Sequence, residues 1–114
     1  MCHVQDTMTR RLPPDPVLKR FLAAVRALYG GRLARAVLYG SRARGDARAD
    51  SDYDIALFLR AMPDRMEEMR RLAEMETEIL LDTGALINAL PFPASAWRER
   101  TAFMGEVRRE GVEV

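Results

Sequence analysis

A stretch near the middle of the chain reads GSRARGDARADSDYDIAL and runs from Gly40 to Leu57. Its Gly-Ser pair is typical of a tight turn, and its last residues alternate as they do in a strand. Asp52 and Asp54 lie two residues apart at the start of that strand, so both carboxylates project from one face. Two such carboxylates can bind one hard cation or a pair of them, and this arrangement suits Mg²⁺.

Apolar residues recur at helical or strand spacing on both sides of this stretch. Capping residues, prolines and glycines set the expected boundaries of each element. The expected order is a helix over 16–29, strands over 34–39 and 53–59, a helix over 63–81, a strand over 85–90 closed by Pro91 and Pro93, a helical stretch from Ser95 to Gly111, and a short strand over 112–114.

The helix over 63–81 is expected to be amphipathic. Its acidic and basic residues, among them Glu67, Glu68 and Arg70, are expected to face the solvent. Its expected buried side consists of Met62, Met66, Met69, Leu72, Ala73, Ile79 and Leu80.

The composition is that of an ordinary globular protein, with 114 residues, 48% hydrophobic and 31% charged. We expect a flexible tail over residues 1–14 and a single domain over 15–114. No apolar run is long enough for a membrane span or a secretory signal. The single cysteine, Cys2, and the single histidine, His3, lie in the expected tail and receive no role, so a reducing cytoplasm is the expected location.

The charges are distributed unevenly along the chain, although the net charge is only +1. Residues 1–48 hold ten basic and three acidic side chains, whereas residues 49–114 hold eight basic and fourteen acidic ones. This asymmetry suggests a face that binds anions. The sequence has no groove-reading motif or aromatic platform, so direct nucleic-acid binding is not expected.

The central stretch resembles the signature of the minimal nucleotidyltransferases of the polymerase-beta-like superfamily. That signature is Gly-Ser-x-x-x-Gly, five further residues, and then Ser-Asp-x-Asp followed by apolar residues. The residues in register are Gly40, Ser41, Gly45, Ser51, Asp52, Asp54 and Ile55. The specific match covers residues 38–57, and the layout of the remainder over 15–114 is similar.

The resemblance implies an α/β (α+β) fold with a small mixed sheet and packed helices, and a transfer reaction that uses Mg²⁺ with ATP or another nucleoside triphosphate. It implies that Asp52 and Asp54 are the catalytic metal ligands, and that Gly40 and Ser41 bind phosphate. A glycine lets the backbone approach a phosphate, and a serine at the start of a helical turn offers a hydroxyl and an amide. Arg42 is a further candidate for phosphate contact.

The expected third strand departs from the family pattern, which commonly supplies a third carboxylate there. This segment contains no acid, and Asn88 is its only polar side chain. Asn88 therefore becomes the third candidate metal ligand, as a neutral oxygen donor; otherwise the site binds metal weakly or does not catalyse. Asp82 is a lower-ranked candidate because it precedes the turn before this strand.

The identity of the acceptor stays open among four hypotheses. The chain ends soon after the expected sheet, so we expect another molecule to present the acceptor hydroxyl. The resemblance favours an antitoxin that transfers AMP to a tyrosine of a helical HEPN-type toxin and so silences it. The alternatives are transfer to a small molecule such as an aminoglycoside, with a homodimer building the pocket, then neutralisation of the partner by binding alone, and then nucleic-acid binding.

Overall fold

The computed structural model describes Leu12 and residues 14–114. The expected tail, with Cys2 and His3, therefore lies almost entirely outside the described residues. The elements are α2 (Pro16–Tyr29), η1 (Gly30–Arg32), β1 (Leu33–Tyr39), α3 (Ser41–Arg44), β2 (Tyr53–Leu59), α4 (Arg65–Thr83), β3 (Ile87–Pro93), η2 (Ala94–Arg98), α5 (Ala102–Glu110) and β4 (Val112–Glu113).

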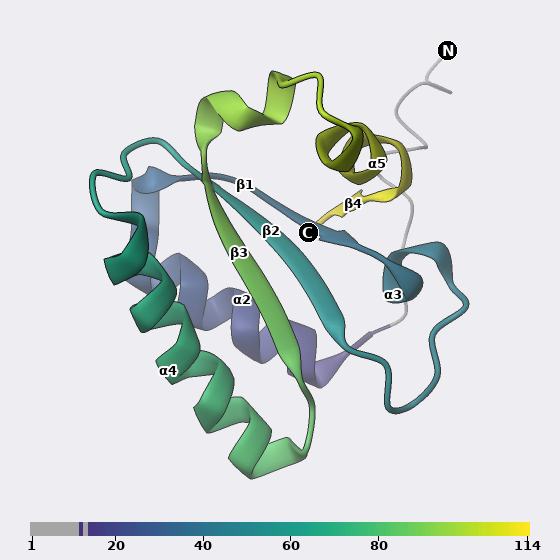
Figure 1. Ribbon diagram of the computed structural model, residues 1–114. Coiled ribbons are helices and arrows are strands. Elements are labelled where there is room, and N and C mark those ends of the chain that lie inside the picture. Colours follow the sequence, from purple (N-terminus) through teal and green to yellow (C-terminus); the bar gives the residue numbers. More distant parts are fainter. Residues whose placement is uncertain (1–11, 13) are drawn as a thin grey trace.

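The four strands form one mixed sheet in the order β3-β2-β1-β4 (Figure 1). β1 pairs antiparallel with both β2 and β4, whereas β2 and β3 are parallel. A parallel pair needs a long crossover connection, and α4 provides it. The expected small mixed sheet with packed helices is therefore confirmed.

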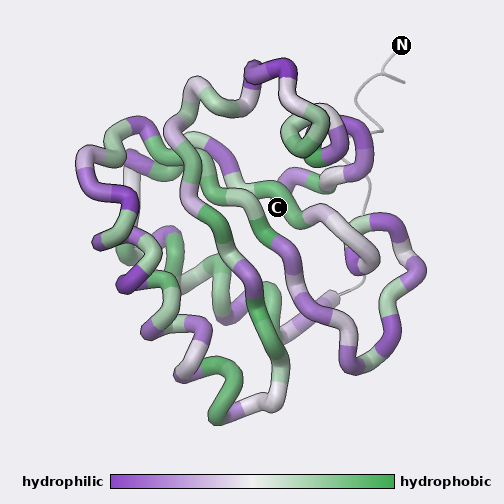
Figure 2. Tube along the Cα trace, in the orientation of Figure 1, coloured by the Kyte–Doolittle hydropathy of each residue, from purple (hydrophilic) through white to green (hydrophobic). Residues whose placement is uncertain are grey.

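The alternation of β2 divides the core into two layers. Ile55, Leu57 and Leu59 face α2 and α4 and belong to the larger buried cluster. Ala56 and Phe58 face the opposite way and pack with residues of η2 and α5, such as Ala96 and Met104. Both faces of β2 are therefore buried along most of its length, which matches the continuous hydrophobic colouring of this part of the strand in Figure 2.

Helix α4 packs through a narrower stripe than its sequence suggests. Its buried residues are Glu68, Leu72 and Ile79, whereas Met66 and Leu80 are 74% and 39% exposed. The expected burial of Met66, Ala73 and Leu80 was wrong, and so was the expected exposure of Glu68. Helical periodicity places residues on a face, but it does not show where a charged partner from another element will meet that face.

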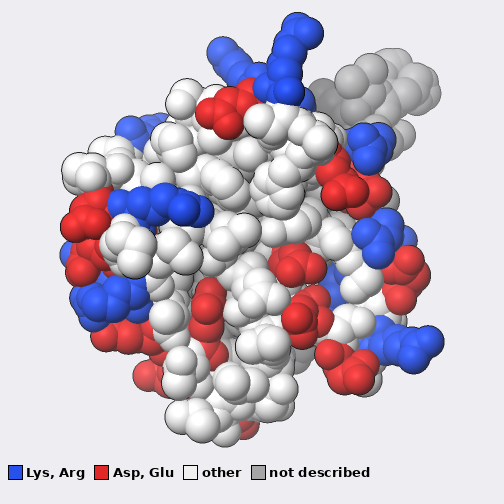
Figure 3. All heavy atoms as spheres, viewed as in Figure 1, with Lys and Arg blue, Asp and Glu red and all other residues white. Residues whose placement is uncertain are grey.

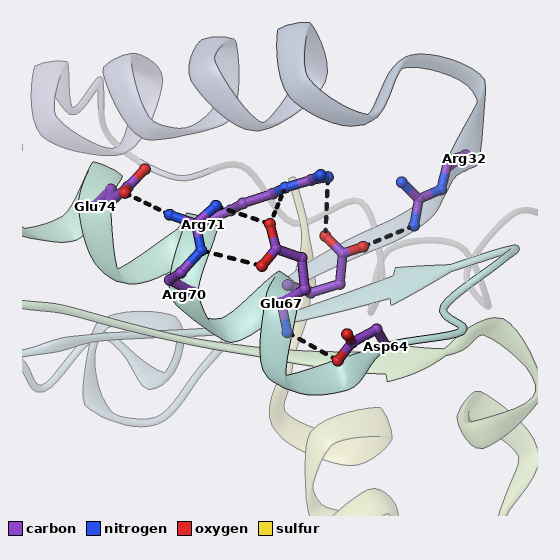
Figure 4. A network of polar contacts seen from close by, with 7 residues as sticks. Arg32, Asp64, Glu67, Arg70, Arg71 and Glu74 are labelled. Atoms are coloured by element: carbon purple, nitrogen blue, oxygen red, sulfur yellow. Dashed lines mark hydrogen bonds and ion pairs between the residues drawn. The ribbon is translucent and has the colours of Figure 1, made fainter.

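The partner of Glu68 is Arg32 of η1, whose guanidinium lies 3.1 Å from the Glu68 carboxylate. Figure 4 shows Arg32 reaching towards α4, while Arg70 and Arg71 form a chain of contacts with the acidic residues of the helix. Glu68 is only 4% exposed, so this ion pair permits a carboxylate to occupy a core position.

Strand β3 extends through Pro91 and Pro93, although these prolines were expected to end it. β3 is an edge strand, and edge strands accept proline where the missing N–H would face away from the sheet. The Ala89 amide, two residues before Pro91, donates to the Glu76 carboxylate on α4 at 3.0 Å. Amides of this parity therefore point away from β2, and proline costs no ladder hydrogen bond there.

The expected helical stretch from Ser95 is divided into η2 and α5. Thr101 interrupts it because its hydroxyl caps α5, accepting from the Met104 amide at 3.1 Å. The chain then returns to the sheet, where β4 extends the β1 edge. Over residue 12 and residues 14–114, the structure contains no helix long and apolar enough to cross a membrane.

Candidate active site

The two aspartates lie at the beginning of β2, a central strand, at the end of the sheet where β1 finishes. Asp54 is paired with Tyr39 of β1 on one side and with Asn88 of β3 on the other. Its position along β2 places it on the same face as Ala56 and Phe58, which is the face covered further along by η2 and α5. Both carboxylates are half-buried.

Asn88 occupies the place that its register predicts, beside the two aspartates. Its amide nitrogen donates to the Asp52 carboxylate at 3.1 Å. Because β2 and β3 are parallel and Asn88 is the partner of Asp54, the amide faces the side of the sheet that carries both carboxylates. The structure therefore brings Asp52, Asp54 and Asn88 together.

Gly40 is held against Asp54 by the turn that follows β1. Its backbone has φ 77° and ψ −159°, a conformation that side-chain-bearing residues rarely adopt. A Cβ added at this position would lie 2.6 Å from Oδ2 of Asp54. Glycine therefore allows the backbone to approach the carboxylate closely. The same turn presents Ser41, the first residue of α3, next to this contact.

Arg42 points away from the carboxylates and holds the loop between α3 and β2. Its guanidinium lies 3.9 Å from the centre of the Tyr53 ring, and it donates to the backbone oxygens of Ser51 and Ala49 at 3.0 and 3.2 Å. Tyr53 in turn donates its hydroxyl hydrogen to Asp15, the N-cap of α2, at 2.7 Å. Arg42 thus connects the loop that carries Asp52 to the first helix, and it is not grouped with Asp52 and Asp54.

Asp82 is also kept away from this place. It lies near the end of α4 and pairs with Arg20 of α2 at 2.7 Å. Within the described part of the chain, no group of three or more His, Cys, Asp and Glu side chains could hold a metal. The potential metal ligands at this position are therefore two carboxylates and one amide.

The electrostatics of the site favour a cation. Burial raises the pKa of Asp54 above its usual range, and the charge of Asp52 raises it further, whereas the Asn88 amide and Arg44 lower it. Burial and the Asp54 charge also raise the pKa of Tyr39 to about 12. A hard cation between the two carboxylates would relieve this repulsion, and carboxylate and amide oxygens are the donors that Mg²⁺ accepts. The residues present therefore fit a magnesium ion.

Three aromatic residues on the face of the carboxylates were not assigned to the site from the sequence, although Phe103 was expected as a core residue. Tyr39 contacts Phe103 of α5 edge-on, with ring centres 5.5 Å apart, and Phe103 lies 5.8 Å from Phe92 of β3. The alternation of β1 and β3 could have placed Tyr39 and Phe92 on the face of Asp54. Nothing in the local sequence indicates that α5 returns over this face.

Comparison with known protein families identifies the family to which this chain belongs. A sequence model described as a nucleotidyltransferase domain matches residues 18–108, which include the whole sheet except β4. The chain belongs to the nucleotidyltransferase family. It is therefore an enzyme that transfers a nucleotide, and the expected family is confirmed.

Two similar proteins come from the archaeon Methanocaldococcus jannaschii, and each carries the name "Putative protein adenylyltransferase". MJ0141 is 29% identical over 98 residues, which cover 86% of this chain and 95% of that protein. MJ0604 is 32% identical over 76 residues, which cover 67% of this chain and 70% of that protein.

Solved structures share the fold at low sequence identity. One is a chain of a toxin–antitoxin crystal structure with AMP-PNP, with a TM-score of 0.59, 16% identity, and coverage of 83% of this chain and 70% of that one. Another is described as a "putative nucleotidyltransferase" from Sulfolobus solfataricus, with a TM-score of 0.54, 18% identity, and coverage of 85% and 75%. These likenesses establish the fold of the nucleotidyltransferase.

Proposed function

We propose that this nucleotidyltransferase transfers AMP from ATP, with Mg²⁺, to a tyrosine hydroxyl of a helical HEPN-type toxin in the cytoplasm, and thereby acts as an antitoxin. The observation that carries the proposal is the contact between the Gly40 turn and Asp54, with Asp52 and Asn88 beside it. The names of the archaeal relatives and the toxin–antitoxin neighbour with AMP-PNP support the choice of donor and partner.

Each residue of the site has a distinct role in this proposal. Asp52 and Asp54 would hold Mg²⁺, which would supply charge neutralisation for the phosphates. Gly40 lets the triphosphate approach the carboxylates, and the hydroxyl and amide of Ser41 donate to its oxygens. A tyrosine oxygen attacks the α-phosphorus, the bond from that phosphorus to the bridging oxygen breaks, pyrophosphate leaves, and the phenolic proton passes to the solvent.

A phenol suits the donor set of this site. Asn88 stands where a further carboxylate could have accepted the proton of the acceptor, and an amide cannot do so. A tyrosine hydroxyl has a pKa of roughly 10, whereas an aliphatic alcohol is far less acidic, so a phenol needs less help from a general base. The absence of a nearby third acid among the described residues therefore favours a tyrosine acceptor.

The test is the transfer of AMP from ATP labelled in the α-phosphate to a purified HEPN-type toxin. We expect Asp52→Asn and Asp54→Asn each to abolish labelling while the fold is retained, because both carboxylates face the metal position. Asp82→Asn is the matched control, because Asp82 is paired with Arg20 between α2 and α4 and should not affect labelling. Unchanged labelling in either site variant would contradict the assignment.

A second candidate function is neutralisation by binding alone, and Asn88 in place of an acid is the observation that favours it. The two functions differ when toxin and antitoxin are expressed together. If the double variant Asp52→Asn/Asp54→Asn restores growth as well as the wild type does, binding is sufficient. If it fails to restore growth but still elutes with the toxin on a sizing column, neutralisation requires AMP transfer.

A further inference from the structure

We propose that the tyrosine ring of the acceptor docks on an apolar shelf formed by Leu90, Phe92 and Phe103, beside Asn88. This inference rests on the proposed function and identifies where the acceptor lies. It assigns a binding role to residues of β3 and α5 that are outside the metal and phosphate positions.

The first argument comes from the order of the strands. The Gly40 turn follows β1, the carboxylates are carried by β2, and Asn88 belongs to β3, which pairs with the opposite edge of β2. The carboxylates therefore stand between the phosphate turn and β3. In phosphoryl and nucleotidyl transfer the attacking and leaving oxygens lie roughly in line on opposite sides of the phosphorus. If pyrophosphate leaves towards Gly40 and Ser41, the acceptor oxygen must approach from the side of β3.

The second argument is the character of the surface on that side. Leu90 and Phe92 follow Asn88 at positions two and four residues further along the same face of β3, and both are half-buried. Phe103 of α5 is 38% exposed and bridges Phe92 and Tyr39 with ring separations of 5.8 and 5.5 Å. Figure 3 shows acidic atoms near the start of β2 with uncharged surface beside and above them on this face.

The shelf is packed against the core through Phe92, which makes it suitable for positioning a flat group. Phe92 stacks on the fully buried Phe58 with ring centres 5.6 Å apart, and Phe58 also contacts Trp97 edge-on at 5.4 Å. A ring added to such a cluster gains aromatic contact and buries apolar surface, whereas a highly polar sugar acceptor would gain little from it. The chemistry of the shelf therefore favours the phenol of a tyrosine.

The experiment compares Phe103→Ala and Phe103→Leu with wild type, using the purified HEPN-type toxin as acceptor and labelled ATP as donor. We expect the KM for the toxin to rise about tenfold in Phe103→Ala and less in Phe103→Leu, with the KM for ATP unchanged. Leu81→Ala is the matched control, since Leu81 is 80% exposed on α4, on the other side of the sheet, and should leave both KM values unchanged. Thermal unfolding of each variant establishes that it is folded, and Phe92→Leu provides a second test if Phe103→Ala is not.

The outcomes separate this inference from the proposed function. If the wild type does not label the toxin, the proposed function fails and the inference fails with it. If the wild type labels the toxin and the Phe103 variants keep its KM for the toxin, the function stands and the shelf is not the acceptor site. A rise in the KM for ATP with an unchanged KM for the toxin would also overturn the inference, because the shelf would then hold the adenine.

Discussion

At Gly40 both the backbone conformation and the close approach to Asp54 require a residue without a side chain. The turn places the α-carbon so close to Asp54 that a methyl group would lie 2.6 Å from the carboxylate oxygen. The positive φ of 77° adds a separate requirement for glycine. The positive φ affects the folding of the turn, and the close approach affects the position of Asp54, the proposed metal ligand.

Gly40→Ala should therefore impair both stability and activity. The unfavourable backbone conformation alone should cost about 1–2 kcal/mol of unfolding free energy, and displacement of Asp54 should remove most AMP transfer. Gly84→Ala serves as the control, because Gly84 has φ 80° but a methyl group added there would meet no atom within 4 Å. Urea unfolding and labelling assays on both variants check the prediction. Equal activity in the two variants would show that the contact with Asp54 is unimportant.

Asn88 is the residue at which the composition of the metal site can be changed. Asn88→Asp replaces the amide donor to Asp52 with a third carboxylate, so the free protein should become less stable through repulsion, whereas Mg²⁺ should bind more tightly. Asn88→Leu should weaken Mg²⁺ binding. The measurement is the magnesium dependence of AMP transfer, with thermal unfolding in the presence and absence of Mg²⁺. Identical magnesium curves for the wild type and both variants would remove Asn88 from the metal site.

The sequence predicted part of the candidate site because strand alternation has a fixed period. The shared face of Asp52 and Asp54 follows from that period, Asn88 was expected from the resemblance to the family, and the structure brings the three residues together. The contacts of Arg42 could not be predicted in the same way, because its guanidinium is bound by the Tyr53 ring and by the backbone of the following loop.

Among the helices and strands, local sequence patterns predicted the ends of an element correctly where residues at those ends determine them. Helix α2 begins where Asp15 caps it and ends at Gly30, as its sequence predicts. Strand β3 and helix α4 differ from expectation because partners distant in the sequence intervene. An edge position accommodates Pro91, and Arg32 makes the core position of Glu68 tolerable.

The Arg32–Glu68 pair should contribute to the attachment of α4. Arg32→Ala would remove the closer ion-pair partner of a carboxylate that is 4% exposed and leave Arg71 at 3.8 Å, and should cost about 1–3 kcal/mol of unfolding free energy. Arg32 also donates to the Ala61 oxygen, so the double variant Arg32→Ala/Glu68→Gln separates the two contributions. It should be more stable than Arg32→Ala alone, because the unpaired charge is removed.

Arg70→Ala is the surface control for this comparison. Arg70 binds Glu67 and Glu74 along the exposed side of α4 (Figure 4), where ion pairs contribute little. Unfolding of the three variants in guanidinium chloride would give the order of their unfolding free energies. If Arg70→Ala were as destabilising as Arg32→Ala, burial of Glu68 would not be the cause.

In the molecule as a whole, the sheet separates the structural layer from the proposed chemical layer. Helices α2 and α4 cover one face with the larger apolar cluster, and the carboxylates lie at the open end of the other face. The strands β1, β2 and β3 separate the two layers, and the contacts of Arg42 and Tyr53 connect the loop that carries Asp52 to Asp15 at the start of α2. Ligands that bind at the start of β2 should therefore stabilise the fold as a whole.

Magnesium and ATP together should raise the melting temperature of the wild type. A ligand at one hundred times its Kd adds about 2.7 kcal/mol to the unfolding free energy, which for a domain of this size corresponds to a shift on the order of 10 °C. ATP with a chelator should give a much smaller shift, because the carboxylates would repel the phosphates without a cation between them. Asp52→Asn and Asp54→Asn should remove the magnesium-dependent part of the shift, whereas Asp82→Asn should keep it. Equal shifts with and without magnesium in the wild type would mean that ATP binds without a metal held by these two aspartates.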